Sequence, residues 1–244
     1  MLYHGKGVEK MKVKVFTDYA CPFCYIGYRL AEKVSDELGI EMEYYFSEIH
    51  PEVPSGGCVT SDIVRGNLDE FNKHIAKLAE GYGIKPKLSS KISNSKKAII
   101  LRGYVLDKHP NKIKEFDEKM YNTYLVENLD IGNEDVLANV LSSVGIEESI
   151  SVALNNTMAN IKFELDRSAT KENYVDSIPT FVVDGRRLVG AVALEELVAF
   201  IQKVWKNQKL SKMLLTGCII SGILSKLSLE SDVRNNLKTS LKKV

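Results

Sequence analysis

Residues 18–27 read DYACPFCYIG, and two cysteines, Cys21 and Cys24, stand three positions apart within this run. This spacing is typical of redox chemistry or of half a metal site rather than of a structural crosslink. Four cysteines in 244 residues are too few for a disulfide scaffold. The dithiol is therefore the feature around which the rest of the sequence has to be interpreted.

The dithiol lies between a predicted strand and a predicted helix. Residues 12–16 alternate polar and apolar side chains, as a β-strand does. From Pro22 onward apolar residues recur at helical spacing until Gly39, and proline is well tolerated in a first helical turn. Residues 42–46 alternate again. The sequence thus predicts a parallel strand–helix–strand unit in which Cys21 caps the helix.

Helical periods dominate the middle of the chain, and we expect no strand among them. The predicted helices are 63–82, 94–106, 113–125, 134–144 and 147–169. Strand patterns return at residues 180–184 and 186–189, on either side of the favoured hairpin turn Asp184-Gly185. A last core helix is expected at residues 194–205.

These patterns predict an α/β fold whose core is interrupted by an all-helical insertion. We expect the core at residues 12–60 and 170–205 and the insertion subdomain at 61–169. A helical C-terminal extension is expected at 206–244. Its apolar stretch at 213–227 is shorter than the roughly 20 residues of a membrane span. The extension is therefore expected to pack either on its own chain or on a second copy, which would make a homodimer.

The charge balance argues against a polyanionic partner. The chain has 33 Lys and Arg against 32 Asp and Glu, and no basic run is interleaved with aromatics, so nucleic acid is not expected to bind. Residues 1–10 lack the apolar run of a signal peptide. We therefore expect a cytoplasmic protein without membrane association.

Two thiols one turn apart at a helix start can complete a thiol–disulfide exchange. The helix N-terminus favours a thiolate on Cys21 by lowering its pKa from the free value of about 8.5, so Cys21 can attack a disulfide. Cys24, one turn further in, is expected to be the more shielded thiol and to resolve the mixed disulfide. No second CxxC or HxxxH pattern accompanies the pair, so no metal ion is expected.

The run at 18–27, together with SIPTF at 177–181 and Gly190-Ala191, resembles the DsbA-like thioredoxin family, and its FrnE-like branch in particular. The resemblance covers about residues 12–205 in element order. It implies a thioredoxin fold split by a helical insertion. It also implies that Cys21 is the nucleophile, that Cys24 is the resolving thiol and that Pro179 is a cis-proline beside them.

The sequence departs from this branch at two places. Phe23 stands where tryptophan is usual, and Asp176-Ser177 stand where glycine and valine are common. Substrate preference is therefore not carried over from the family. Phe23 also supplies no charge, so the helix end alone is expected to acidify Cys21.

A cis-proline at a strand start would leave the backbone of Ile178 facing the thiols, where it could pair with an extended substrate. A plain trans-proline opening an edge strand is the alternative if Pro179 is considered without the dithiol. The residues expected to contact substrate are Pro22, Phe23, Ile178 and Thr180. The expected partners are protein or peptide thiols and disulfides, with glutathione or a thioredoxin-type reductant as a further candidate. No cofactor beyond a redox-active Cys21–Cys24 disulfide is expected.

The predicted function is that of a thiol:disulfide oxidoreductase or isomerase acting on protein disulfides through the CPFC dithiol. One rival is the glutathione-binding group of kappa-class transferases and 2-hydroxychromene-2-carboxylate isomerases, which typically carries serine and lacks the second thiol. Another rival is a non-catalytic module that binds a metal ion or docks a partner. Both cysteines are present here, which favours the first reading.

The two remaining cysteines, one histidine and the two tyrosines beside the dithiol each have a functional and a structural interpretation. Cys58, in a loop after the second predicted strand, could be a third redox thiol, although an incidental loop cysteine is the more common case. Cys218 is expected to be a small core hydrophobe. His50 is expected to play a hydrogen-bonded structural role. Tyr19 and Tyr25 flank the dithiol, where packing is the default and shaping of a substrate groove the alternative.

Overall fold

The computed structural model describes residues 12–207, of which residues 12–197 belong to one compact unit. Residues 194–207 are helical, as expected for 194–205. The stretch at 213–227, Cys218, nearly all of the extension at 206–244 and the homodimer expected through it lie outside the described residues. No helix among residues 12–207 is long and apolar enough to cross a membrane.

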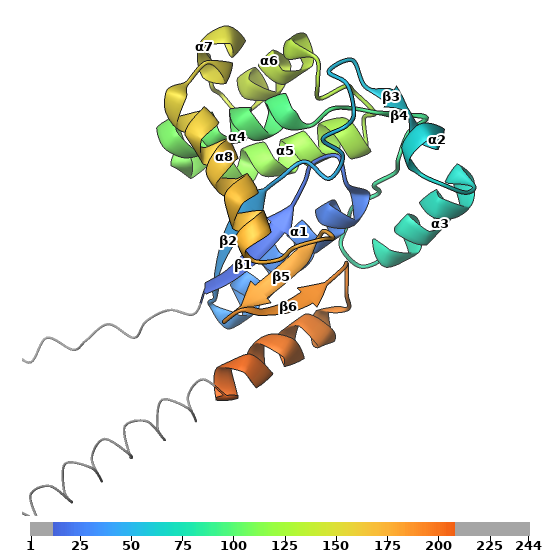
Figure 1. The fold of residues 1–244 in the computed structure, drawn as a ribbon, viewed down its shortest axis with the longest axis vertical. Helices are drawn as coiled ribbons and strands as arrows, with labels where there is room; N and C mark the ends of the chain where they lie inside the picture. The colour runs from blue at the N-terminus through green and yellow to red at the C-terminus, as the bar shows by residue number, and fades with distance from the viewer. Residues whose placement is uncertain (1–11, 208–244) are drawn as a thin grey trace, which may run out of the picture. The chain divides into compact units, whose positions relative to one another are not determined.

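A four-stranded sheet forms the centre of the unit, in the order β2-β1-β5-β6 (Figure 1). Its strands are β1 (Lys12–Thr17), β2 (Glu41–Phe46), β5 (Thr180–Val183) and β6 (Arg186–Val189). β1 pairs with β2 in parallel and with β5 antiparallel, so two segments about 160 residues apart in sequence become neighbours. This is the predicted α/β fold, with the parallel unit and the hairpin where the sequence indicated them.

Helix α1 (Pro22–Leu38) connects β1 to β2 and packs against both strands. Pro22 occupies its first turn, and the helix ends at Gly39 in the left-handed conformation (φ 63°), where the Gly39 N–H binds the Ser35 carbonyl. The hairpin turn also has positive φ at Asp184 and Gly185. Both ends of α1 and the β5–β6 turn are therefore placed by local chemistry that the sequence carries.

The region between β2 and β5 is mostly helical. Its elements are β3 (Cys58–Val59), α2 (Thr60–Ile63), α3 (Leu68–Leu78), β4 (Lys91–Ile92), α4 (Lys96–Lys108), the 3-10 turn η1 (Pro110–Lys112), α5 (Ile113–Leu125), α6 (Glu134–Ser143), α7 (Ile150–Leu154) and α8 (Thr157–Glu172). α8 packs on α4 and β2, and α4 also packs on α5. Figure 1 shows α4 to α8 gathered beside the sheet, with α3 set apart from them.

The expectation of an all-helical insertion is wrong in one detail. β3 and β4 form a small antiparallel ribbon in which Cys58 pairs with Ile92. Each strand is only two residues long, too short to leave an alternating pattern in the sequence. The proposed boundaries between core and insertion, at residues 60 and 169, stay a prediction.

Asparagine caps change two of the predicted helices: one starts later than expected and the other is divided in two. The helix expected at 63–82 starts only at Leu68 and ends at Leu78, and the Asn67 side chain accepts hydrogen bonds from the N–H groups of Asp69 and Glu70. The helix expected at 147–169 is interrupted between α7 and α8, where Asn156 caps α8 in the same way. Asparagine competes well for free helix N–H groups, so a new helix starts at each of these residues.

Candidate active site

Cys21 occupies the N-cap position of α1 with an extended backbone (φ −106°, ψ 116°). Its carbonyl accepts hydrogen bonds from the N–H groups of Cys24 at 3.0 Å and Tyr25 at 3.4 Å, while its side chain makes no capping bond. The first turn of α1 contains no acidic residue. The backbone of Cys21 therefore lies at the positive end of the helix, and the first helical turn carries no carboxylate that would offset the helix dipole.

Cys24 is fully buried, whereas 4% of Cys21 is exposed. Burial raises the pKa of the Cys24 thiol well above its ordinary value, and the neighbouring Cys21 sulfur raises it further. The polar groups of the Thr17 side chain and of the Asp18 backbone oppose this rise in pKa. Cys24 is thus the more shielded thiol, and its raised pKa disfavours the thiolate form.

The Ile178–Pro179 segment lies against the dithiol. The Ile178–Pro179 peptide bond is cis, and the Ile178 carbonyl oxygen lies 4.0 Å from the Cys21 sulfur. Ile178 is half-buried and Pro179 is buried. The fold therefore brings together Cys21 and Ile178, which are 157 positions apart in the sequence.

Gly27 in the DYACPFCYIG run explains how α1 can approach this segment so closely. A Cβ atom at Gly27 would lie 2.8 Å from both Cβ and Cγ of Pro179. Real Cβ contacts are essentially never that short, so glycine is the residue that fits here. The last residue of the motif thus works as a spacer between helix and proline.

The predicted substrate-contacting residues do not all reach the surface. Phe23 and Ile178 are half-buried, whereas Pro22 is buried in the first turn of α1. Thr180 is 1% exposed, and its hydroxyl donates to the Ser177 carbonyl at 2.6 Å. Only Phe23 and Ile178 of these four are therefore in a position to meet a partner in this conformation, and their roles stay predictions.

Helix α3 contributes two residues at this site that the sequence gave no reason to single out. Phe71 packs edge-to-face on Phe23, with ring centroids 5.6 Å apart and an interplanar angle of 89°. His74, exposed on the same helix, has its ring centroid 6.2 Å from that of Phe23. α3 is amphipathic in sequence, but no local signal says that it packs next to the dithiol.

On the other side of the dithiol, α4 and α5 supply a buried ion pair. Arg102 binds Asp117 through Nε at 2.9 Å and through Nη2 at 3.0 Å, and Tyr19 donates its hydroxyl proton to the same carboxylate. The Arg102 guanidinium also lies 4.3 Å from the centre of the Phe46 ring. Tyr19 is fully buried, so it anchors the loop before Cys21 rather than lining a groove.

Asp18, the first residue of the motif, is also fully buried. Its carboxylate accepts hydrogen bonds from the backbone N–H groups of Ala20 at 3.1 Å and Ile49 at 2.8 Å. Burial raises the pKa of this carboxyl, and these hydrogen bonds oppose the rise. Asp18 therefore ties the loop before Cys21 to the segment after β2.

The remaining candidates lie away from the dithiol or are used structurally. His50 binds Glu52 through Nδ1 at 3.0 Å, as its structural interpretation predicts. Cys58 lies on β3 and packs with a separate apolar cluster around Val53 and Leu88. Partial burial and the carboxylates of nearby acids raise the pKa of the Cys58 thiol, which is the opposite of an activating setting. Tyr25 is fully buried in the aromatic packing.

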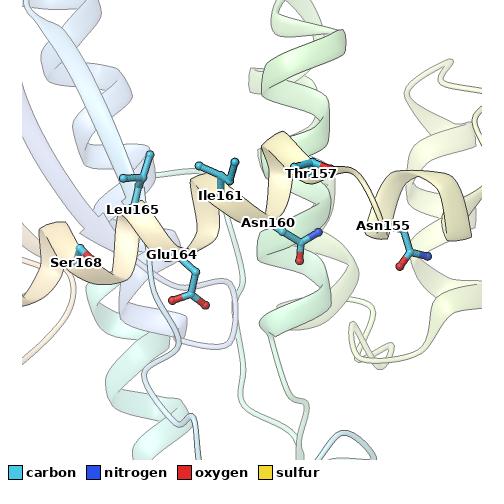
Figure 2. Close-up of a pocket in the computed structure, with 7 residues that line it drawn as sticks. All are labelled: Asn155, Thr157, Asn160, Ile161, Glu164, Leu165 and Ser168. Carbon is cyan, nitrogen blue, oxygen red and sulfur yellow. The ribbon is translucent and has the colours of Figure 1, made fainter.

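A shallow groove on α8 is not part of this site. Its apolar residues Ile161 and Leu165, 45% and 59% exposed, project from one side of the helix, and Asn160 and Glu164 from the other (Figure 2). No residue that lines it belongs to the dithiol site. Within residues 12–207 no group of three or more His, Cys, Asp or Glu side chains is arranged to hold a metal ion.

Comparisons with known proteins identify a family and a relative of this chain. The family model of the DSBA-like thioredoxin domain matches residues 12–202. The uncharacterized protein YwbO of Bacillus subtilis (strain 168) is 23% identical over 181 residues, which cover 73% of this chain and 90% of YwbO.

Solved structures also share the fold. A probable DsbA oxidoreductase from Streptomyces coelicolor superposes with a TM-score of 0.69 at 16% identity, covering 80% of this chain and 90% of that one. A 2-hydroxychromene-2-carboxylate isomerase superposes with a TM-score of 0.63 at 17% identity, covering 82% and 98%. At these identities the likeness concerns the fold, which hosts more than one chemistry.

Proposed function

We infer, since this chain belongs to the DSBA-like thioredoxin domain family, that it is a thiol:disulfide oxidoreductase or isomerase acting on protein and peptide disulfides. The observation that carries this proposal is the asymmetry of the two thiols. Cys21 lies at the N-cap of α1 beside the Ile178 carbonyl, and Cys24 is fully buried one turn further in. Cys21 is therefore placed to attack a substrate disulfide, and Cys24 to react only after the mixed disulfide has formed.

The exchange balances without a cofactor. The Cys21 thiolate attacks one sulfur of a substrate disulfide, the substrate S–S bond breaks, and the departing sulfur leaves with the electron pair and takes up a proton. Cys24 then loses its proton and attacks the Cys21 sulfur, which releases the second substrate thiol. The substrate gains two electrons and the Cys21–Cys24 pair becomes a disulfide, which glutathione or a thioredoxin-type dithiol would reduce again.

The surroundings of Cys21 favour a partner that presents an extended segment. The half-buried Phe23 and Ile178 flank the thiol, and the Ile178 backbone borders the start of β5. A peptide can add main-chain hydrogen bonds to the backbone of residue 178, just before β5, while its side chains contact the apolar surface made by Phe23 and Phe71. These contacts support the assignment of Phe23 and Ile178 to substrate binding.

We propose a cytoplasmic protein of the FrnE-like branch that works as a reductase or isomerase rather than as a net oxidase. Cytoplasmic glutathione and thioredoxin pools keep most dithiols reduced. The dipeptide between the cysteines, Pro22-Phe23, carries no charge that would stabilise the thiolate further and make the disulfide more oxidising. A glutathione-dependent isomerase like the 2-hydroxychromene-2-carboxylate enzyme is the alternative that shares the fold.

Serine substitution of each cysteine tests the proposal. Cys21→Ser is expected to abolish reduction of insulin disulfides, because the attacking sulfur is lost. Cys24→Ser is expected to accumulate a mixed disulfide that a mass spectrum of the intact protein detects. Cys58→Ser, which removes a thiol of a separate cluster, serves as the matched control and should keep full activity.

Two outcomes would overturn this assignment. Activity retained by Cys21→Ser would show that the dithiol is not the reacting group. Glutathione-dependent isomerisation of a 2-hydroxychromene carboxylate that survives Cys24→Ser, with no insulin reduction by the unmodified protein, would favour the alternative enzyme.

A further inference from the structure

Residues 18–20 form the loop between the end of β1 and Cys21, and the side chain of its middle residue reaches far outside the loop. The Tyr19 hydroxyl donates to the Asp117 carboxylate on α5, 98 positions away. The loop itself is a turn, since the Cys21 N–H binds the Asp18 carbonyl at 3.4 Å. A contact that fixes Tyr19 therefore also bears on the position of the attacking cysteine, two residues further on.

Four buried residues from four segments close a circuit of contacts around Tyr19. Arg102 on α4 binds both oxygens of Asp117, with Nε 2.9 Å from Oδ1 and Nη2 3.0 Å from Oδ2. The Arg102 guanidinium lies 4.3 Å from the centre of the Phe46 ring, and the centre of that ring lies 4.5 Å from the centre of the Tyr19 ring. The hydroxyl of Tyr19 is thus held by the ion pair, and its ring is held by the residue that the same ion pair covers.

The chemistry of this circuit favours a role in geometry over a role in stability alone. Burial raises the pKa of the Asp117 carboxyl, and Arg102 and Tyr19 oppose the rise. A hydrogen bond from a phenol to a carboxylate is stronger than one between neutral groups. A buried ion pair, by contrast, often adds no more stability than apolar side chains of the same volume would. What this pair supplies beyond packing is a strong, directional acceptor for Tyr19.

We propose that Asp117 is a positioning residue for Cys21: through its hydrogen bond to Tyr19 it holds the loop in the conformation from which Cys21 attacks a disulfide. The inference rests on the function proposed above and adds no step to the exchange. Without this hydrogen bond the loop populates other conformations, and the rate of attack falls to the fraction of molecules that keep the reactive one. The ion pair between α4 and α5 thereby sets the reactivity of a thiol at the start of α1.

Two substitutions separate this positioning role from support of the fold. Tyr19→Phe removes the donor and leaves the Arg102–Asp117 pair in place. Alkylation of Cys21 by iodoacetamide should then slow about fivefold, the factor that corresponds to one net hydrogen bond. Asp117→Asn removes the charge but keeps an oxygen at the Oδ1 position, which serves both Tyr19 and Nε of Arg102. This variant should lose more stability than Tyr19→Phe and yet be alkylated faster than it.

Tandem mass spectrometry identifies the alkylated cysteine, and urea unfolding measures stability. Tyr25→Phe is the matched control, because this phenol lies in the same aromatic cluster and also bonds α5, at Asn122 with 3.0 Å, but belongs to α1 and not to the loop before Cys21. Its alkylation rate should equal that of the unmodified protein. Insulin reduction by Tyr19→Phe should show a lower kcat with an unchanged KM, because the surface at Phe23 is not altered.

Three outcomes would overturn the proposal. Tyr19→Phe could be alkylated as fast as the unmodified protein, Tyr25→Phe could be slowed as much as Tyr19→Phe, or the alkylation rate could simply follow stability, with Asp117→Asn the slowest variant. An unmodified protein that fails to reduce insulin, while the variants keep the expected order of alkylation rates, would contradict the proposed function and still support the positioning of Cys21 by Asp117.

Discussion

The two sides of the dithiol are built differently. On the α5 side, Tyr121 and the Arg102–Asp117 pair are buried, and their polar atoms are engaged with the catalytic loop through Thr17 and Tyr19. On the α3 side, the half-buried Phe71 and the exposed His74 meet the dithiol only through the ring of Phe23. The first side supports the segment that leads to Cys21, while the second presents half-buried aromatic rings. In the proposed function, the chemistry and the recognition of substrate are therefore separated in space.

The largest effect is expected when the buried ion pair is broken. Asp117→Ala leaves the Arg102 charge and the Tyr19 hydroxyl without their acceptor, and removing one member of a buried pair costs about 3–5 kcal/mol of unfolding free energy. Urea unfolding followed by circular dichroism measures this loss.

Its control is Glu134→Ala, which breaks the exposed ion pair between Lys97 and Glu134, where the side chains are 38% and 48% exposed. That substitution should cost less than about 1 kcal/mol. Equal losses of unfolding free energy in the two variants would mean that the buried pair does not anchor the loop before Cys21. The α5 side would then be no more firmly built than the α3 side.

A smaller effect is expected from the spacer glycine. Gly27→Ala places a methyl group 2.8 Å from Pro179, so α1 and the Ile178–Pro179 segment must move apart at a cost of about 1–3 kcal/mol. Insulin reduction should slow as the Ile178 carbonyl leaves Cys21. Gly56→Ala, at a position with no atom within 4 Å, should leave stability and activity unchanged. Unaltered activity in Gly27→Ala would show that this close approach is dispensable.

The smallest effect on stability is expected on the α3 side. Phe71→Leu keeps an apolar side chain but removes the edge-to-face pair with Phe23, at a cost of about 0.5–1.5 kcal/mol. Peptide disulfides should show a higher KM with little change in kcat, because only the recognition surface is altered. Lys77→Ala, at an exposed position on the same helix, is the control and should leave KM and kcat unchanged. A fall in kcat with an unchanged KM would assign α3 to the chemistry instead.

The sequence is most informative where local patterns decide the outcome. The strand–helix–strand unit, the Asp184-Gly185 hairpin and the position of the dithiol follow from alternation, capping and turn chemistry within a few residues. The asparagine caps at Asn67 and Asn156 are also local signals. Each lies within a longer stretch of apolar residues at helical spacing, which predicts one continuous helix across the cap. Helix boundaries were therefore harder to predict than the fold.

The supporting residues of the site could not be predicted in this way. Tyr121, Asp117 and Phe71 lie in ordinary amphipathic helices, and nothing near them in sequence indicates which strand or loop they contact. Their roles depend on how helices pack after the sheet has formed. Cys21, Cys24 and Pro179 could be singled out because the CPFC run and the SIPTF run resemble a family pattern, whereas the residues that tune them have no such pattern.

The long separations within the site bear on when the protein can become active during its synthesis. Thr17 and Tyr121 are 104 positions apart, Tyr19 and Asp117 are 98 apart, and Cys21 and Ile178 are 157 apart. The dithiol leaves the ribosome early, but α5 and then β5 must follow before its surroundings exist. A nascent chain that ends before residue 178 thus carries both cysteines without the site that controls them.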